Sequence, residues 1–130
     1  MNSDLKLFRK LFFVSIFLSV PIFAEDSKGS IYLNCINTDE FLRGTQNGNE
    51  TLVIDLDKKL FSSKTAFEWK LTENNTYYFA SRQNLFALVE YTLNRVSLEL
   101  RYKNTQIIDG KLDPTKWSYN NYQCEIVERI

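Results

Sequence analysis

Hydrophobic and polar residues alternate with a period of two along most of the chain after residue 30. Residues 96–102 are the clearest case, because apolar side chains occupy every second position and Ser97, Glu99 and Arg101 occupy the positions between them. Residues 52–57 and 66–71 alternate in the same way. This periodicity is typical of strands in an antiparallel sheet that has one buried face and one face in water.

Turn-forming residues separate these strands from several others. Further strands are expected at 30–36, 60–62, 76–80, 85–91 and 122–127. Turns are expected at 57–59, 73–75, 82–84, 103–105 and 109–110, one helical turn at 40–44, and polar loops at 44–50 and 113–121. The pattern predicts an all-β fold: a small antiparallel meander of about seven or eight strands that forms a barrel or a sandwich.

The first 24 residues have the composition of a cleavable signal peptide. Basic residues precede an apolar run over 11–20, and Ala24 places a small residue before the expected cleavage site. A membrane anchor is the alternative interpretation, but a spanning helix needs roughly 20 apolar residues and this run is shorter. We therefore expect a cleaved signal helix over 1–24 and one domain over 25–130, exported by a bacterium to the periplasm or secreted.

Removal of the signal peptide changes the charge and leaves both cysteines in place. The remaining chain carries 13 basic and 15 acidic residues, a net charge of −2. A slightly acidic domain has no electrostatic footprint for nucleic acid or for an anionic membrane, so neither is an expected partner. In an oxidising compartment, Cys35 and Cys124 are expected to form one disulfide between the first strand and the last.

The absence of histidine argues against most catalytic chemistry. It removes the usual general base and the commonest metal ligand, so we expect no enzyme activity, no cofactor and no metal site. A small carboxylate-dependent hydrolase is the remaining enzymatic alternative, and it requires Glu68, Glu90 or Glu99 to line one cleft. Glu68 and Glu99 alternate with Lys70 and Arg101, which favours cross-strand ion pairs on the wet face instead.

Aromatic residues are the main candidates for a binding surface. Fourteen of them follow residue 24, and Tyr77, Tyr78 and Phe79 are consecutive, so both faces of that strand carry rings. Many of these rings can simply fill the core. The alternative is a surface that binds a protein partner or a small apolar ligand. Its candidate residues are Trp69, Tyr77, Tyr78, Phe79, Trp117 and Tyr119.

Residues 54–59, 93–100 and 122–127 resemble a group of small exported bacterial proteins to which no function is assigned. In that group an Ile-Asn-Arg-x-Thr-Gly-x-Leu strand precedes a terminal strand that contains a cysteine, and here Leu98 stands where the group has glycine. The resemblance implies a β domain and no activity. Asn94 is expected to turn the chain, and Arg95 to pair with Glu90 across a hairpin end.

The chain is also similar to the periplasmic inhibitors of C-type lysozyme, which are small disulfide-linked β-barrels. An inhibitor of a cell-wall hydrolase is therefore the alternative to a general binding module. The Ser-Gly-x-x-Tyr signature of those inhibitors is absent, so no inhibitory residue is assigned.

Overall fold

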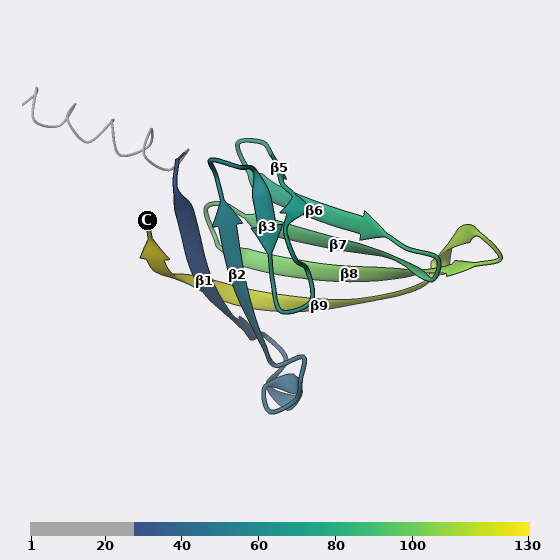
Figure 1. Cartoon of the computed structure of the whole chain (residues 1–130). Coiled ribbons are helices and arrows are strands. Elements are labelled where there is room, and N and C mark those ends of the chain that lie inside the picture. The colour runs from purple at the N-terminus through teal and green to yellow at the C-terminus, as the bar shows by residue number, and fades with distance from the viewer. Residues whose placement is uncertain (1–27) are drawn as a thin grey trace, which may run out of the picture.

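Nine antiparallel strands form one sheet that curls almost into a closed barrel (Figure 1). The computed structural model describes residues 28–130, so the predicted signal peptide over 1–24 lies outside the described residues. None of the helical structure in residues 28–130 is long and apolar enough to cross a membrane. The strands are β1 (Ser30–Asn37), β2 (Asn49–Asp55), β3 (Leu60–Ser62), β4 (Trp69–Lys70), β5 (Thr72–Glu73), β6 (Tyr77–Gln83), β7 (Ala87–Asn94), β8 (Glu99–Ile108) and β9 (Lys111–Arg129).

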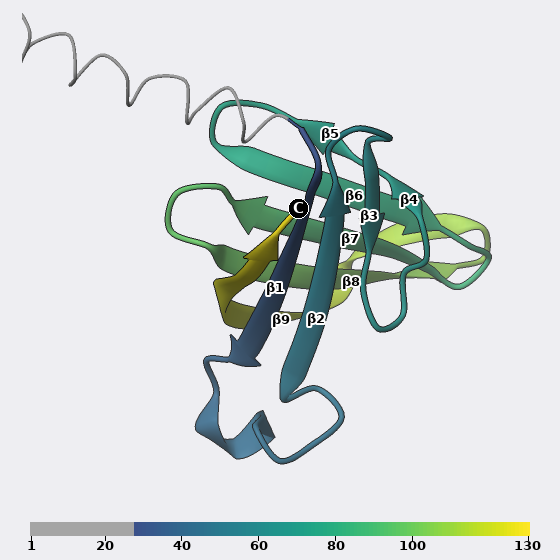
Figure 2. The ribbon, with the colours of Figure 1, turned by 60° about the vertical axis from the view of Figure 1, so that its left-hand side comes forward.

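The strand order is β4-β3-β2-β1-β9-β8-β7-β6-β5, which is a meander closed by the pairing of the first strand with the last. β4 and β5 lie at opposite ends of this order, yet Leu71 alone separates them in the chain. The short segment 69–73 therefore pairs with β3 on one side and with β6 on the other, and nearly closes the barrel. Figure 2 shows β1–β3 crossing β6–β8 at a steep angle. The prediction of an all-β antiparallel meander is confirmed.

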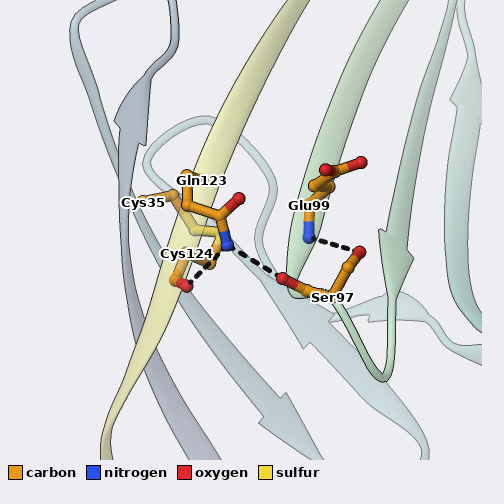
Figure 3. Close-up of a disulfide and its surroundings, with 5 residues drawn as sticks. All are labelled: Cys35, Ser97, Glu99, Gln123 and Cys124. Atoms are coloured by element: carbon orange, nitrogen blue, oxygen red, sulfur yellow. Dashed lines mark hydrogen bonds between the residues drawn. A yellow bond between two sulfur atoms is a disulfide. The ribbon is translucent and has the colours of Figure 1, made fainter.

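A disulfide joins β1 to β9 inside the barrel (Figure 3). Cys35 and Cys124 are direct partners in the β1–β9 register, at a sequence separation of 89. Both side chains are almost fully buried. The predicted disulfide is confirmed, and it staples the two strands whose pairing closes the sheet.

The core consists of the inward-facing alternate residues of nearly every strand. Along β1, Ile31, Leu33 and Cys35 are all at most 5% exposed, while the residues between them face outward or are half-buried. The largest fully buried side chain, Tyr91 of β7, contacts three other rings, with centroid distances of 4.8 Å to Phe61, 5.9 Å to Trp69 and 5.1 Å to Tyr102. This cluster fills the centre of the barrel.

Short-range turn chemistry agrees with the sequence at several positions. The β8–β9 turn is Asp109-Gly110, where both residues have positive φ, as a two-residue hairpin turn requires. Asp39 caps a single 3-10 turn (Glu40–Leu42) by accepting a hydrogen bond from the Phe41 N–H. Asn94 turns the chain by accepting hydrogen bonds from the N–H groups of the two residues at 96 and 97.

Two segments expected to be irregular are strands. Residues 103–105 lie inside β8, and residues 113–121 lie inside β9. Their polar side chains suggest loops in isolation, but each segment has a register partner on the other strand, as in the pair Thr105 and Trp117. Cross-strand pairing therefore overrides the local turn preference.

Two apolar residues expected to face inward are exposed because the backbone leaves the extended conformation beside them. Phe67 is 78% exposed, and the next residue, Glu68, has a φ of 53°. Val96 is 86% exposed in the turn before β8, and Leu98 has a φ of 59°. A left-handed residue interrupts the period of two, so the alternation predicted across each of these points is wrong.

The left-handed backbone at Leu98 carries an energetic cost. The left-handed region costs a residue with a Cβ roughly 1–2 kcal/mol and costs glycine almost nothing. The Leu98 side chain packs against the core, which offsets part of that cost.

Glu50 is the one buried carboxylate among residues 28–130. It lies on β2 two residues before Leu52, so the period of two turns it inward, and it is 6% exposed. Its carboxylate accepts a hydrogen bond of 2.8 Å from the Lys64 N–H. Burial raises the pKa of Glu50 above its ordinary value of 4.5, because the ionised form is desolvated, and the hydrogen bonds from Lys64 and Ser63 only partly oppose this.

The disulfide is expected to supply much of the stability of the domain. Replacing both cysteines by alanine should lower the free energy of unfolding by about 2–5 kcal/mol, because the unfolded chain regains the freedom of a long loop. Urea denaturation of the variant and of the reduced wild-type protein measures this, since the reduced protein keeps both sulfur atoms. An unchanged midpoint in both samples would contradict the assignment.

Glu50 is expected to make stability depend on pH in a specific direction. The pKa of Glu50 in the folded protein lies above its value in the unfolded chain. At a pH between these two pKa values, the native state therefore binds more protons than the unfolded state. The free energy of unfolding should therefore fall as pH rises from about 4.5 through the folded pKa, and Glu50→Gln should abolish this fall. Urea denaturation of both proteins across this range checks it; a difference that does not change with pH would refute it.

Candidate functional site

The outer face of β6–β9 gathers most of the predicted surface aromatics. In the strand registers Phe79, Thr92, Arg101 and Asn121 are neighbours in one row across the four strands. The next row is Ser81, Glu90, Lys103 and Tyr119, and the third is Gln83, Leu88, Thr105 and Trp117. Alternate residues of each strand share this face, so the sheet register itself assembles the surface.

Trp117 and Tyr119 form an exposed aromatic pair on β9. Their rings stack with centroids 5.2 Å apart, and they are 49% and 45% exposed. The Arg101 guanidinium lies 4.8 Å from the centroid of the Tyr119 ring, and the Lys103 ammonium lies 5.3 Å from that of Trp117. These cation–π contacts hold both rings against β8. The pair is therefore an ordered surface feature.

A groove of about 530 Å³ lies beside this pair on the same face. Its walls include Tyr77, Thr92, Asn94, Glu99, Arg101 and Gln123. Arg101 connects the groove to the aromatic pair, because its Nε donates to the Asn121 Oδ1 at 3.2 Å while its guanidinium covers Tyr119. The groove thus presents hydroxyl, amide, carboxylate and guanidinium groups within one concave surface.

The groove is tied to the disulfide through β9. Gln123 is the residue before Cys124, and its side-chain amide donates a hydrogen bond of 2.8 Å to the Ser97 carbonyl oxygen (Figure 3). The Ser97 hydroxyl accepts a hydrogen bond from the Glu99 N–H at 3.3 Å. These contacts fix the start of β8, where Glu99 enters the groove.

The six predicted surface aromatics divide into two groups. Tyr77 and Phe79 lie half-buried on the outer face, with ring centroids 5.6 Å apart, and Trp117 and Tyr119 lie on the same face. Trp69 and Tyr78 lie in the core at 8% and 6% exposure, so their assignment to a surface is wrong. The strand at 77–79 does carry rings on both faces, but the inward one belongs to the core.

The ends of the β6–β7 and β8–β9 hairpins continue this face beyond the barrel. We call residues 80–90 and 101–121 the β6–β9 extension; Figure 1 shows its strands running past β3. The Ile107 N–H donates to the Phe86 carbonyl at 2.8 Å and so joins the two hairpin ends. Besides Trp117 and Tyr119, four large apolar side chains are exposed here: Leu85, Phe86, Ile108 and Leu112.

The carboxylates of the hydrolase alternative do not line one cleft. Glu99 lines the groove, Glu90 lies opposite Lys103 further along the sheet, and Glu68 lies in the segment before β4. The ion pairs expected for Glu68 and Glu99 are also not formed, since Lys59 with Glu73 is the ion pair found within residues 28–130.

Arg95 does not pair with Glu90. It donates to the Asn74 carbonyl oxygen at 2.6 Å and lies 4.7 Å from the centre of the Tyr78 ring. The predicted contact is wrong because the turn at 94–97 carries Arg95 to the end of the barrel.

The polar walls of the groove were not predicted from the sequence. Asn121 and Gln123 flank Tyr122 in the strand, and since Tyr122 shares the inward face of Cys124, they face outward. The prediction of a loop at 113–121 concealed the outward position of these side chains.

Comparison with known protein families, with curated proteins and with solved structures gives no match, so the evidence for function is the geometry of the site.

The two tryptophans are expected to differ sharply in solvent access. Trp117 is half-exposed and Trp69 is nearly buried. The Trp117→Phe variant, which keeps only Trp69, should emit at shorter wavelength and resist acrylamide quenching. The Trp69→Phe variant should emit at longer wavelength and be quenched several-fold more strongly. Equal quenching of the two variants would show that the aromatic pair is covered.

Proposed function

We propose that this protein is a non-enzymatic binding module that works outside the cytoplasm and binds another protein through the outer face of β6–β9. The observation that carries the proposal is the exposed Trp117–Tyr119 pair beside a polar groove and a tip of four exposed apolar side chains. Trp, Tyr and Arg are the residue types that dominate protein–protein binding energy, and all three meet here.

The size of the face suits a protein partner. Four strands spaced about 4.8 Å apart, over about ten residues of 3.3 Å each, give a surface of roughly 600 Å² before the hairpin ends are included. A standard interface buries about 800 Å² on each partner. The groove accepts a partner side chain, and its amide and charged groups supply the polar contacts that orient it.

A small apolar ligand is less well supported. The apolar cavity at one end of the barrel, lined by Ile31, Ile54 and Leu93, has a volume of about 240 Å³. Ligand pockets usually measure about 300–1,000 Å³. The cavity therefore falls below the usual range, while the outer groove lies well within it.

An inhibitor of a cell-wall hydrolase is a specific form of the same proposal. The extension protrudes beyond the barrel with Leu85 and Phe86 at one hairpin end, and a protruding hairpin can enter a substrate cleft. A disulfide persists in the oxidising compartments where such enzymes act, which supports a periplasmic or secreted location.

Site-specific photo-crosslinking tests the proposed face. p-Benzoylphenylalanine is placed at Phe86 or Tyr119, and at Phe67 or Ile36 as controls of matched exposure, 78% against 77% and 50% against 45%. In extracytoplasmic extract of the producing organism, positions 86 and 119 should give the same discrete adduct and positions 67 and 36 should give none. Adducts that are absent, or equal at all four positions, would refute the proposal.

A competition experiment distinguishes specific binding from nonspecific adsorption. An excess of unlabelled wild-type protein should remove the adduct, whereas the Trp117→Ala, Tyr119→Ala double variant should compete at least tenfold less well. Identification of the adduct by mass spectrometry then allows an inhibition assay. If the partner is a cell-wall hydrolase, the wild-type protein should inhibit it and the double variant should not.

A further inference from the structure

A third pocket, open to solvent, lies at the end of the barrel nearest the 43–48 loop. Its volume is about 300 Å³. The floor consists of Glu50 from β2, Tyr91 from β7 and Tyr122 from β9, all buried, together with the half-buried Tyr102 from β8. The rim is formed by exposed residues of two loops at 46–47 and 64–65. A buried floor beneath an exposed rim is the geometry of a binding pocket rather than of a packing defect.

Within residues 28–130 the Glu50 carboxylate forms no ion pair, and Lys64 is the lysine whose charge acts on it from the rim. No lysine ammonium or arginine guanidinium nitrogen of residues 28–130 lies within 4.0 Å of the carboxylate. The carboxylate receives the Lys64 N–H, and the Lys64 ammonium itself turns to the rim, where it donates to the Gln46 carbonyl oxygen at 2.6 Å. Burying an ionised carboxylate without a paired cation is costly, and folding alone does not require it.

The hydroxyls of Tyr91 and Tyr122 line the same floor as Glu50 and add hydrogen-bonding capacity. Burial, followed by the nearby Glu50 charge, raises the pKa of Tyr122 to about 12. Tyr91 is held in place by the Ser63 hydroxyl, which donates to it at 3.0 Å, and by the Thr65 hydroxyl at 3.1 Å. When Glu50 is ionised, the floor carries one negative charge beside phenolic oxygens, which can accept hydrogen bonds.

We infer that this pocket binds a small protonated primary amine, whose ammonium group lies between the Glu50 carboxylate and the tyrosine hydroxyls. An ammonium has three N–H donors and one positive charge, which match the acceptors and the charge of the floor. The carboxylate repels anions. Neutral apolar molecules gain nothing there, because entering the pocket would desolvate its polar groups without replacing their hydrogen bonds. This inference is independent of the outer face.

Substitution of Lys64 distinguishes an ammonium ligand from a zwitterion or an anion. Its side chain lines the rim, so its charge opposes an ammonium and would favour a carboxylate. Its backbone N–H, which bonds Glu50, is present whatever the side chain. Lys64→Gln should therefore strengthen amine binding about twofold, the effect expected of one exposed like charge. A site for a carboxylate-bearing ligand would be weakened by the same change.

NMR titration of the tyrosine ring resonances tests the inference on the full protein in phosphate buffer, which contains no amine. Butylammonium should shift the Tyr91, Tyr102 and Tyr122 signals in a saturable way, whereas 1-butanol and butyrate should not. Glu50→Gln should raise the dissociation constant at least tenfold while keeping an oxygen that accepts the Lys64 N–H. Glu99→Gln, in the outer groove, is the control and should leave it unchanged.

The outcomes divide cleanly. Amine-specific shifts that are lost in Glu50→Gln support the inference, provided that the amide spectrum of the variant matches that of the wild type. Equal shifts with 1-butanol, unchanged affinity in Glu50→Gln, or no tyrosine shift with butylammonium at any concentration would overturn it.

Discussion

The pairing of the first strand with the last is the constraint on which the rest of the structure depends. β1 is the first strand along the chain and β9 is the last, yet Cys35 and Cys124 face each other in their register and are covalently joined. Side chains alternate with a period of two, so this one pair fixes which residues of β9 point inward, including Tyr122, and which point outward, including Gln123. The inner pocket and the outer groove therefore both depend on the terminal pairing.

The same pairing explains why part of the sheet projects from the barrel. The last β1–β9 pair is Asn37 with Tyr122, and there the Asn37 side chain accepts the Asp39 N–H and turns the chain away from the sheet. Residues 117–120 of β9 consequently pair with β8 alone. An open strand edge invites unwanted pairing. Pro114, which has no N–H, and the charged Lys116 lie just before this segment and oppose such pairing.

The sequence predicts those features that depend on a local period or on a single covalent choice. Alternation identified most strands and their faces, and the two cysteines of the chain permitted one intramolecular disulfide. The alternation pattern failed to predict the structure where long-range contacts decide it. Residues 117–121 form a strand because β8 pairs with them, and the left-handed backbone at Glu68 and Leu98 interrupts the alternation without any local signal. Trp69 and Tyr78 could not be assigned to the core before the closure of the barrel was known.

Glu50 shows that the period of two can continue through a polar residue on the inward face of a strand. Leu52 and Ile54 mark the inward face of β2, and one further step back along that face gives Glu50. If the charged residue is taken as the end of the strand, the inward position of Glu50 is missed. The period of two instead places Glu50 among the core residues. On β8 and β9 the two surfaces then use neighbouring residues: Arg101 faces the groove while Tyr102 faces the inner pocket. A one-residue register slip would exchange the two faces, so the disulfide that holds the register preserves both surfaces at once.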